Sequence, residues 1–284
     1  MIKMAANSDR TLPTDGEQIL MVARYDTLKH LRSRRLLGMI VIEVVMLVLM
    51  LALPPLLGQP YSDDPALFVQ GVIAVFTYIL IVLVATLFAG DAIVSEYQNR
   101  TGYLLFPNPI KRTSIYLGKF LSMAAISVLI ITIWYGVAIM AGLAVTGGVS
   151  GLAVQSYGLA LLLALAAGSV GFLISAFMKG ATGALILTFI LLFMIMPALD
   201  GTLGEIGGIR TEPSLSFQSG VINYVLTTPY PVDSSDSIPI APGQNFTVYS
   251  LFPHVDTAVA VMSGYILICN AVAIWRFGRR EMVG

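Results

Sequence analysis

Charged residues are scarce in this chain of 284 residues, where they make up 11%, against roughly 25% in an ordinary soluble domain. Hydrophobic residues make up 57%. A soluble enzyme of this size could not cover its surface with so few charges, and a disordered chain or a nucleic-acid binder would need more of them. The composition therefore excludes these classes and predicts an all-α polytopic membrane protein.

Several motifs of catalysis and metal binding are also absent. The chain has no G-x-x-x-x-G-K-[ST] phosphate loop, so we expect it not to bind ATP in the P-loop manner. It has no H-E-x-x-H motif, and its single cysteine, Cys269, lies in an apolar stretch without metal-ligand spacing. We therefore expect a chain that is not an enzyme and that carries no cofactor or metal of its own.

Six apolar stretches reach the length of about 20 residues that a helix needs to cross the hydrocarbon core. They cover residues 36–57, 67–90, 114–146, 155–178, 182–199 and 257–275. The third stretch is long enough to be tilted or to extend into water. We predict six transmembrane helices that form a single domain over residues 1–284.

The positive charges are distributed unevenly between the two sides of these spans. Of the 16 lysines and arginines, seven precede the first span, four lie between the second and third, one lies between the fourth and fifth, and three follow the sixth. The opposite side receives only Arg210, together with eight of the 16 acidic residues. By the positive-inside rule, we expect a multi-pass protein of the cell membrane with cytoplasmic termini, residues 1–35 and 276–284.

Two cytoplasmic segments outside the spans have a helical pattern. In residues 16–35 apolar residues recur at helical spacing and basic residues occupy other positions, which predicts a helix lying along the membrane surface or, alternatively, only a charged flank of the first span. In residues 91–113, Glu96 and Arg100 have the favourable i, i+4 order, Gly102 weakens the helix and Pro109 helps to end it. This second segment could contact a cytoplasmic partner or form a solvated loop.

One long external segment, residues 200–256, separates the fifth and sixth spans. It is rich in glycine, proline, serine and acidic residues. Apolar residues between 217 and 226 predict one short amphipathic helix, and four prolines from 229 to 242 predict that the rest is irregular. The segment could be a lid over a transport pathway or a linker.

Glu43 is the one ionisable group placed well inside a predicted span. A charged carboxylate at that depth is costly unless it is paired, protonated or hydrated, so we expect it to face other helices. By depth, Lys119 near the start of the third span is its nearest candidate partner. The residue could form a structural pair or a substrate or proton site. The scarcity of such groups favours an energy source outside the spans.

The segment after the second span carries a resemblance to a known family. The residues concerned are Gly90-Asp91-Ala92-Ile93-Val94-Ser95-Glu96, Arg100-Thr101-Gly102, Pro109-Ile110-Lys111-Arg112 and Leu117-Gly118-Lys119. This pattern resembles the type-2 ABC exporter permeases, whose interfacial elbow helix is similar to the basic stretch of residues 23–35. Tyr103 departs from the pattern, because a small residue is commoner there.

The resemblance implies a membrane-spanning permease subunit of an ATP-driven exporter. Two such chains would pair as a homodimer or heterodimer, each resting on a separate ABC ATPase subunit that binds ATP and magnesium. Coupling to the ATPase would then involve a set within the second cytoplasmic segment: Asp91, Glu96, Arg100, Thr101, Gly102 and Pro109. The lipid bilayer is a further partner, and no nucleic acid is expected. The alternative is a secondary transporter or channel that needs no ATPase.

Overall fold

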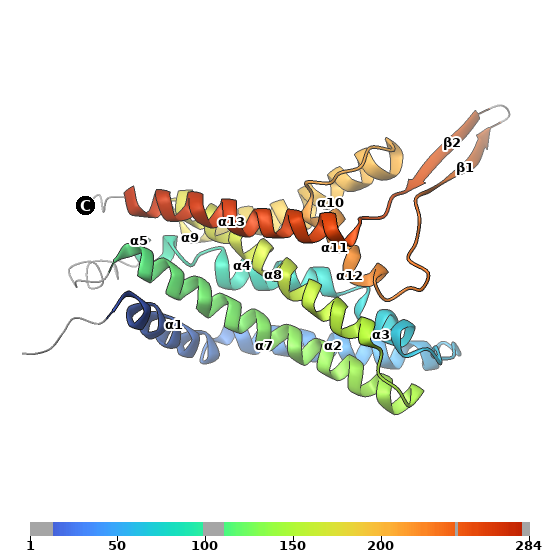
Figure 1. Ribbon diagram of the computed structural model, residues 1–284, viewed down its shortest axis with the longest axis horizontal. Helices are drawn as coiled ribbons and strands as arrows, with labels where there is room; N and C mark the ends of the chain where they lie inside the picture. The colour runs from blue at the N-terminus through green and yellow to red at the C-terminus, as the bar shows by residue number, and fades with distance from the viewer. Residues whose placement is uncertain (1–13, 99–110, 242–243, 280–284) are drawn as a thin grey trace, which may run out of the picture.

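The structure, a computed structural model, describes residues 14–98, 111–241 and 244–279. Long helices run side by side through most of the molecule, and a small part with a β-hairpin projects from one end (Figure 1). Six helical segments of the described residues are long and apolar enough to cross a membrane. The prediction of an all-α polytopic membrane protein with six spans is therefore confirmed.

The chain enters the bundle through two helices with a short break between them. Helix α1 (Asp15–Leu31) begins at Thr14, whose side chain and that of Glu17 cap each other's backbone. Helix α2 (Arg34–Leu56) begins at Ser33, whose hydroxyl accepts a hydrogen bond from Leu36 N. Because both starts are capped by side chains, the basic amphipathic segment forms a helix separate from the first span.

The second predicted span is interrupted. Helix α3 (Pro65–Ile73) is followed by three residues of turn before α4 (Thr77–Ala89) begins. Asn223 Nδ2, from the external segment, donates a hydrogen bond to the carbonyl of Ala74 in this turn, at 3.4 Å. The prediction of one continuous helix over residues 67–90 was wrong: residues 74–76 form a turn, and a side chain from a distant segment binds this turn.

Two long helices form the centre of the bundle. Helix α7 (Arg112–Thr146) has 35 residues, or about 50 Å at about 1.5 Å per residue, which exceeds the about 30 Å of the hydrocarbon core. Helix α8 (Gly151–Phe177) packs against α4, α7 and α13. At Gly171 a Cβ atom would lie 2.9 Å from Ala89 Cβ, so the glycine allows α4 and α8 to approach closely.

The fifth span is longer than predicted. Helix α9 (Ala181–Ile190) continues through a π-helical turn, η1 (Leu191–Ile195), then α10 (Met196–Leu199) and a second π-helical segment, η2 (Asp200–Ile206). The predicted end at residue 199 was therefore seven residues too early. Asp200 and its neighbouring glycines suggested a loop, but the helix continues into the external region with altered hydrogen bonding.

The external segment contains more regular structure than its prolines suggested. Two short helices, α11 (Leu215–Ser219) and α12 (Val221–Tyr224), replace the single helix predicted there. Strands β1 (Ser234–Ala241) and β2 (Gln244–Ser250) pair as an antiparallel hairpin. The prediction of an irregular segment was wrong here, because an edge strand tolerates a proline such as Pro239.

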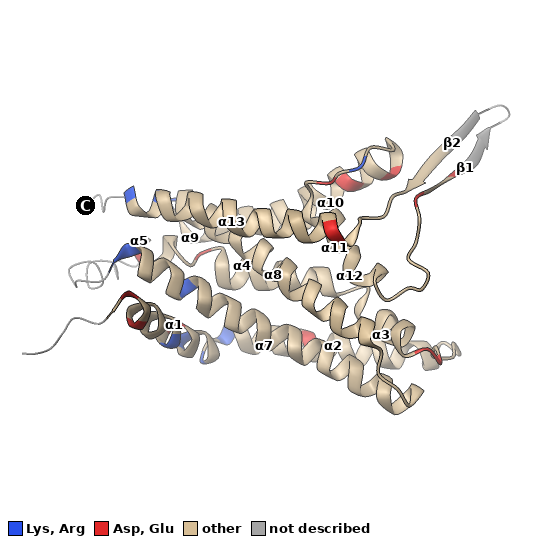
Figure 2. Cartoon of the chain, viewed as in Figure 1, with Lys and Arg blue, Asp and Glu red and all other residues tan. Residues whose placement is uncertain are grey.

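The last span, α13 (Val255–Arg279), packs against α8 and returns the chain to the end of the bundle where α1 and α5 lie (Figure 1). Lysines and arginines gather at this end, which we call the basic end, and acidic residues gather at the opposite, acidic end (Figure 2). The fold therefore separates the charges along the bundle axis.

Candidate functional site

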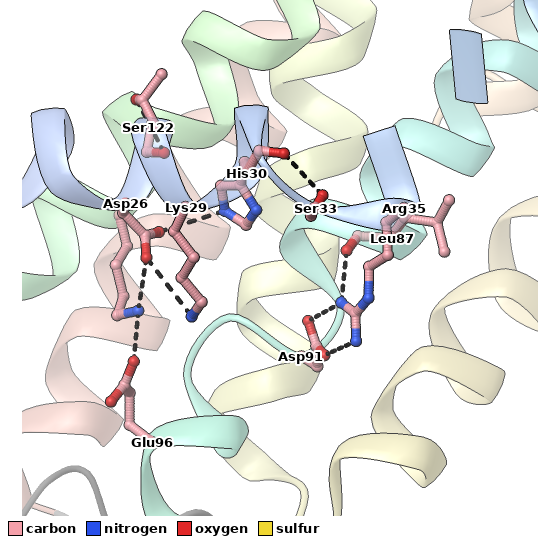
Figure 3. A network of polar contacts seen from close by, with 11 residues as sticks. Asp26, Lys29, His30, Ser33, Arg35, Leu87, Asp91, Glu96 and Ser122 are labelled. Carbon is pink, nitrogen blue, oxygen red and sulfur yellow. Dashed lines mark hydrogen bonds and ion pairs between the residues drawn. The ribbon is translucent and has the colours of Figure 1, made fainter. Parts of the chain in front are cut away.

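The candidate site lies at the basic end, where α1, the start of α2, the end of α4 and the start of α7 meet around α5 (Val94–Gln98). We call it the junction. Residues 90–93 turn the chain from α4 into α5, which has only five residues. Polar side chains from α1, α2 and this turn face one another here (Figure 3).

Lys119 of α7 is the central cation of the junction. Its ammonium nitrogen lies 2.7 Å from Glu96 Oε1 and 3.5 Å from Asp26 Oδ1. All three side chains are largely buried, and the lysine side chain is only 5% exposed. One cation thus joins α5 and α1 to the third span. Removing it would take from both carboxylates, in a largely buried site, the cation that they share.

Asp26 of α1 collects further partners. His30 Nε2 lies 3.4 Å from Asp26 Oδ2, and Lys29 Nζ lies 3.9 Å from Oδ1 (Figure 3). Burial alone would raise the pKa of Asp26, but the hydrogen bond from His30 and the positive charge of Lys119 lower it to about 2. Asp26 therefore stays ionised under all physiological conditions.

A second ion pair fixes the turn that precedes α5. Arg35, at the start of α2, donates to both carboxylate oxygens of Asp91, at 3.1 and 2.8 Å. The same guanidinium donates to the carbonyl of Leu87 at 3.0 Å, which helps to cap the end of α4 (Figure 3). A bidentate pair fixes both the distance between the guanidinium and the carboxylate and their relative orientation. We therefore expect the first span and the turn to move together.

Backbone contacts attach α5 to the fourth and fifth spans. Ser175 Oγ of α8 accepts hydrogen bonds from the backbone N–H groups of Ile93 and Val94, at 2.9 and 3.0 Å. Gln98 Oε1 accepts one from the backbone N–H of Ala181, at 2.8 Å, where α9 begins. These contacts satisfy N–H groups that helix starts leave without a partner.

Helix α1 is attached along α7. At Gly118 a Cβ atom would lie 2.6 Å from Val22 Cβ and 2.8 Å from the carbonyl oxygen of Ile19, so only glycine permits this approach. Thr27 Oγ1 also donates to Ser122 Oγ of α7, at 3.0 Å. The Leu-Gly-Lys sequence at the third span therefore has a physical reason: its glycine admits α1 and its lysine binds α1 and α5.

The residues singled out from the sequence have different outcomes. Asp91, Glu96 and Lys119 come together in the junction. Arg100, Thr101, Gly102 and Pro109 lie outside the described residues, so the predicted pair of Glu96 with Arg100 stays a prediction. Glu96 is buried rather than displayed on a surface, with 8% of the residue exposed.

Glu43 differs from the sequence interpretation. It is fully buried, as expected for a carboxylate that faces other helices. Lys119, however, contacts Glu96 and Asp26 instead, and neither carboxylate oxygen of Glu43 has a hydrogen-bond partner among the described residues. The prediction that Lys119 would be its partner was wrong. The reason is that Glu96 of α5 and Asp26 of α1 both reach the lysine.

Sequence reasoning missed several members of the junction: Asp26, His30, Arg35 and Ser175. Asp26 carried a usable signal, because it is the only acidic residue in the basic stretch of residues 18–35. Arg35 belonged to a run of arginines in which no position stood out. Ser175 carried no signal, since a serine in an apolar span commonly bonds to its own helix.

Comparison with known proteins gives one result over nearly the whole chain. The family model described as ABC-2 family transporter protein matches residues 20–282. No curated protein matches the sequence. The matched range includes the junction and all six spans. The chain therefore belongs to the ABC-2 transporter family, as a multi-pass membrane permease of the ABC transporters.

Proposed function

We propose that this chain is the permease subunit of an ATP-driven exporter in the cell membrane. It pairs with a second permease chain and works with separate ABC ATPase subunits that bind ATP and magnesium. Family membership and the absence of a phosphate loop from the sequence support this division of labour. The uneven distribution of lysine and arginine supports cytoplasmic termini, with the acidic end outside.

The observation that carries the proposal is the set of attachments made by residues 91–98. Asp91 binds the first span, Glu96 binds the third, the N–H groups of Ile93 and Val94 bind the fourth, and Gln98 binds the start of the fifth. A force on this short segment would reach four spans at once. We propose that the ATPase docks on residues 91–113 and moves the spans through these contacts.

Helix α1, which corresponds to the elbow helix of the family, contacts the same residues. Asp26 shares Lys119 with Glu96, and α1 is packed against α7 through Gly118. Helix α1 lies outside the six apolar spans, so it can follow a tilt of α7 without crossing the bilayer. We propose that it holds the cytoplasmic end of the third span at the membrane surface while the spans rearrange.

Coupling can be tested with the exporter reconstituted in lipid vesicles together with its ABC ATPase subunit. The variant Glu96→Gln keeps the shape of the side chain but weakens the contact with Lys119. Asp236→Asn, at an exposed position of the hairpin, removes an acid from the opposite end and serves as the matched control. We expect Glu96→Gln to lower ATP hydrolysis linked to transport several-fold and the control to leave it unchanged.

Docking is tested separately by crosslinking. In a Cys269→Ser background, Gln98→Cys should crosslink to the ATPase, whereas Ser234→Cys on the hairpin should not. A fully coupled Glu96→Gln exporter together with no crosslink at position 98 would contradict the proposal. Transport driven by an ion gradient in the purified chain alone would favour the secondary transporter instead.

A further inference from the structure

A cavity of about 310 Å³ opens at the acidic end, far from the junction. Five elements form its walls: α10, η2, α11, α12 and the end of β2 with the residues that follow it. Its volume reaches the range of small-molecule pockets, about 300 to 1,000 Å³. The external segment therefore builds a concave site instead of only linking two spans.

Two carboxylates line this cavity from one π-helical segment. Asp200 and Glu205 are five residues apart in η2. In an α-helix, residues five apart point about 140° away from each other, at about 100° per residue. In a π-helix, hydrogen bonds run from residue i to i+5, which places such residues near each other on one side. The altered winding thus brings both acidic groups to the same cavity.

The two carboxylates have no cationic partner within the described part of the chain. Asp200 Oδ2 accepts a hydrogen bond from Ser214 Oγ at 2.9 Å, while Oδ1 is buried and accepts none. Arg210 is the only lysine or arginine in residues 200–256. It is held elsewhere, by Glu212 at 2.9 Å and Asp233 at 2.8 Å.

Aromatic rings complete the lining. Phe217 comes from α11, Tyr224 from α12 and Tyr249 from β2. The ring of Tyr224 meets that of Phe252 edge-on, with centroids 4.8 Å apart, which fixes its orientation. Burial and the charge of Glu205 raise the pKa of Tyr224, so its hydroxyl stays protonated. Aromatic faces attract cations most strongly where water is partly excluded.

A metal ion fits this cavity poorly. No group of three or more histidine, cysteine, aspartate or glutamate side chains suited to a metal occurs in the described ranges. A calcium ion takes six to eight oxygen ligands, and the two carboxylates offer only part of that set. An ammonium group needs fewer fixed ligands, because carboxylates and aromatic faces stabilise it together.

We propose that this cavity binds a small organic cation through its ammonium group. Asp200 and Glu205 neutralise the charge, and Tyr224 and Tyr249 contact the ammonium and the carbon atoms next to it. The proposal goes beyond the exporter function and does not depend on the ATPase. In an exporter with the topology proposed above, the site would face the side on which substrate is released.

Binding is tested by calorimetry on the full chain in lipid nanodiscs, with no ATPase or nucleotide present. Three probes share one ring: benzylammonium is cationic, benzyl alcohol is neutral and benzoate is anionic. We expect saturable binding of benzylammonium only, weakened by salt because charges attract the ligand. Replacing both acids, Asp200→Asn with Glu205→Gln, should weaken binding at least tenfold, and the control Asp236→Asn should not.

Glu205→Gln alone keeps the test decisive if Asp200→Asn prevents folding, because Asp200 also holds Ser214. This single variant should weaken binding several-fold. Equal binding of all three probes, or benzylammonium binding that both variants leave unchanged, would overturn the proposal. Saturable binding of calcium chloride with no binding of benzylammonium would also overturn it, in favour of a metal site. A chain that binds benzylammonium but never couples to an ATPase would refute only the exporter function.

Discussion

The acidic residues of the junction and those of the cavity at the acidic end have opposite surroundings. At the basic end, Asp26, Asp91 and Glu96 each contact a lysine or arginine, and Lys119 between two of them is almost fully buried. At the acidic end, Asp200 and Glu205 line a cavity and have no lysine or arginine partner among the described residues, while Arg210 is bound by other acids and remains partly exposed.

This difference indicates that the two ends have different functions. Paired charges that are shielded from water resist separation, so the basic end is suited to transmitting movement between helices. Carboxylates without a cationic partner attract positive charge, so the acidic end is suited to binding a cation. The following predictions test whether burial and pairing, rather than the mere presence of charge, separate the two ends.

Removing Lys119 should give the largest effect. Lys119→Met leaves Glu96 and Asp26 in a buried site without their shared cation, which is expected to cost about 3–5 kcal/mol of stability. Thermal unfolding in detergent should show a large drop in midpoint. The double variant Lys119→Met with Glu96→Gln should lose less than the sum of the two single losses. Strictly additive losses would show that the pair does not act as a unit.

Asp26 should show a smaller effect that depends on pH. Its folded pKa of about 2 lies below its ordinary value of 3.8, so its stabilising contribution is present above pH 4 and is lost as the pH falls toward 2. At pH 7, Asp26→Asn should cost about 2 kcal/mol, since one pKa unit corresponds to about 1.36 kcal/mol. The stabilities of the two proteins, measured by denaturant unfolding, should converge as the pH falls from 4 toward 2. A gap independent of pH would contradict this origin.

Glu43 lies between the two ends, and replacing it should raise stability instead of lowering it. It is buried with no partner among the described side chains, so Glu43→Leu is expected to raise stability by about 1 kcal/mol. Leu47→Ala, in the same buried stripe of α2, is the control and should lower stability by about 2–5 kcal/mol. Unfolding midpoints measure both. A strong loss of stability in Glu43→Leu would reveal a partner for this carboxylate.

Arg210 should show the smallest effect on folding. Its side chain is 31% exposed, and ion pairs of this kind contribute about 0–1 kcal/mol. Arg210→Gln should therefore change the unfolding midpoint little, in contrast to Lys119→Met. Because it removes a positive charge from the acidic end, it should also strengthen benzylammonium binding slightly. A destabilisation as large as that of Lys119→Met would remove the distinction between the two ends.

The spans were easy to predict because apolar length is a local property. Residues 112–146 and 151–177 form helices close to the predicted limits. The break at residues 74–76 and the π-helical extension to Ile206 were not predictable in this way. In the first case the hydrogen bond comes from Asn223, about 150 positions away in the chain.

The junction was predictable only in part. Glu96 and Lys119 were both singled out, but as members of different pairs, because depth along a span gives one coordinate and leaves the direction around the helix open. Asp26 and Ser175 enter the site from helices whose packing no local pattern specifies. The acidic cavity was missed altogether, since five elements build it.

The sequence by itself determined the membrane class, the number of spans and the separation of charge between the two ends. These depend on composition and on apolar runs, which act over about 20 residues wherever the chain is placed. Only the tertiary structure decided which carboxylates have a cationic partner. The pairing of a carboxylate with a cation depends on how the helices are rotated and how closely they approach. For example, α1 can pack against α7 only because residue 118 is a glycine.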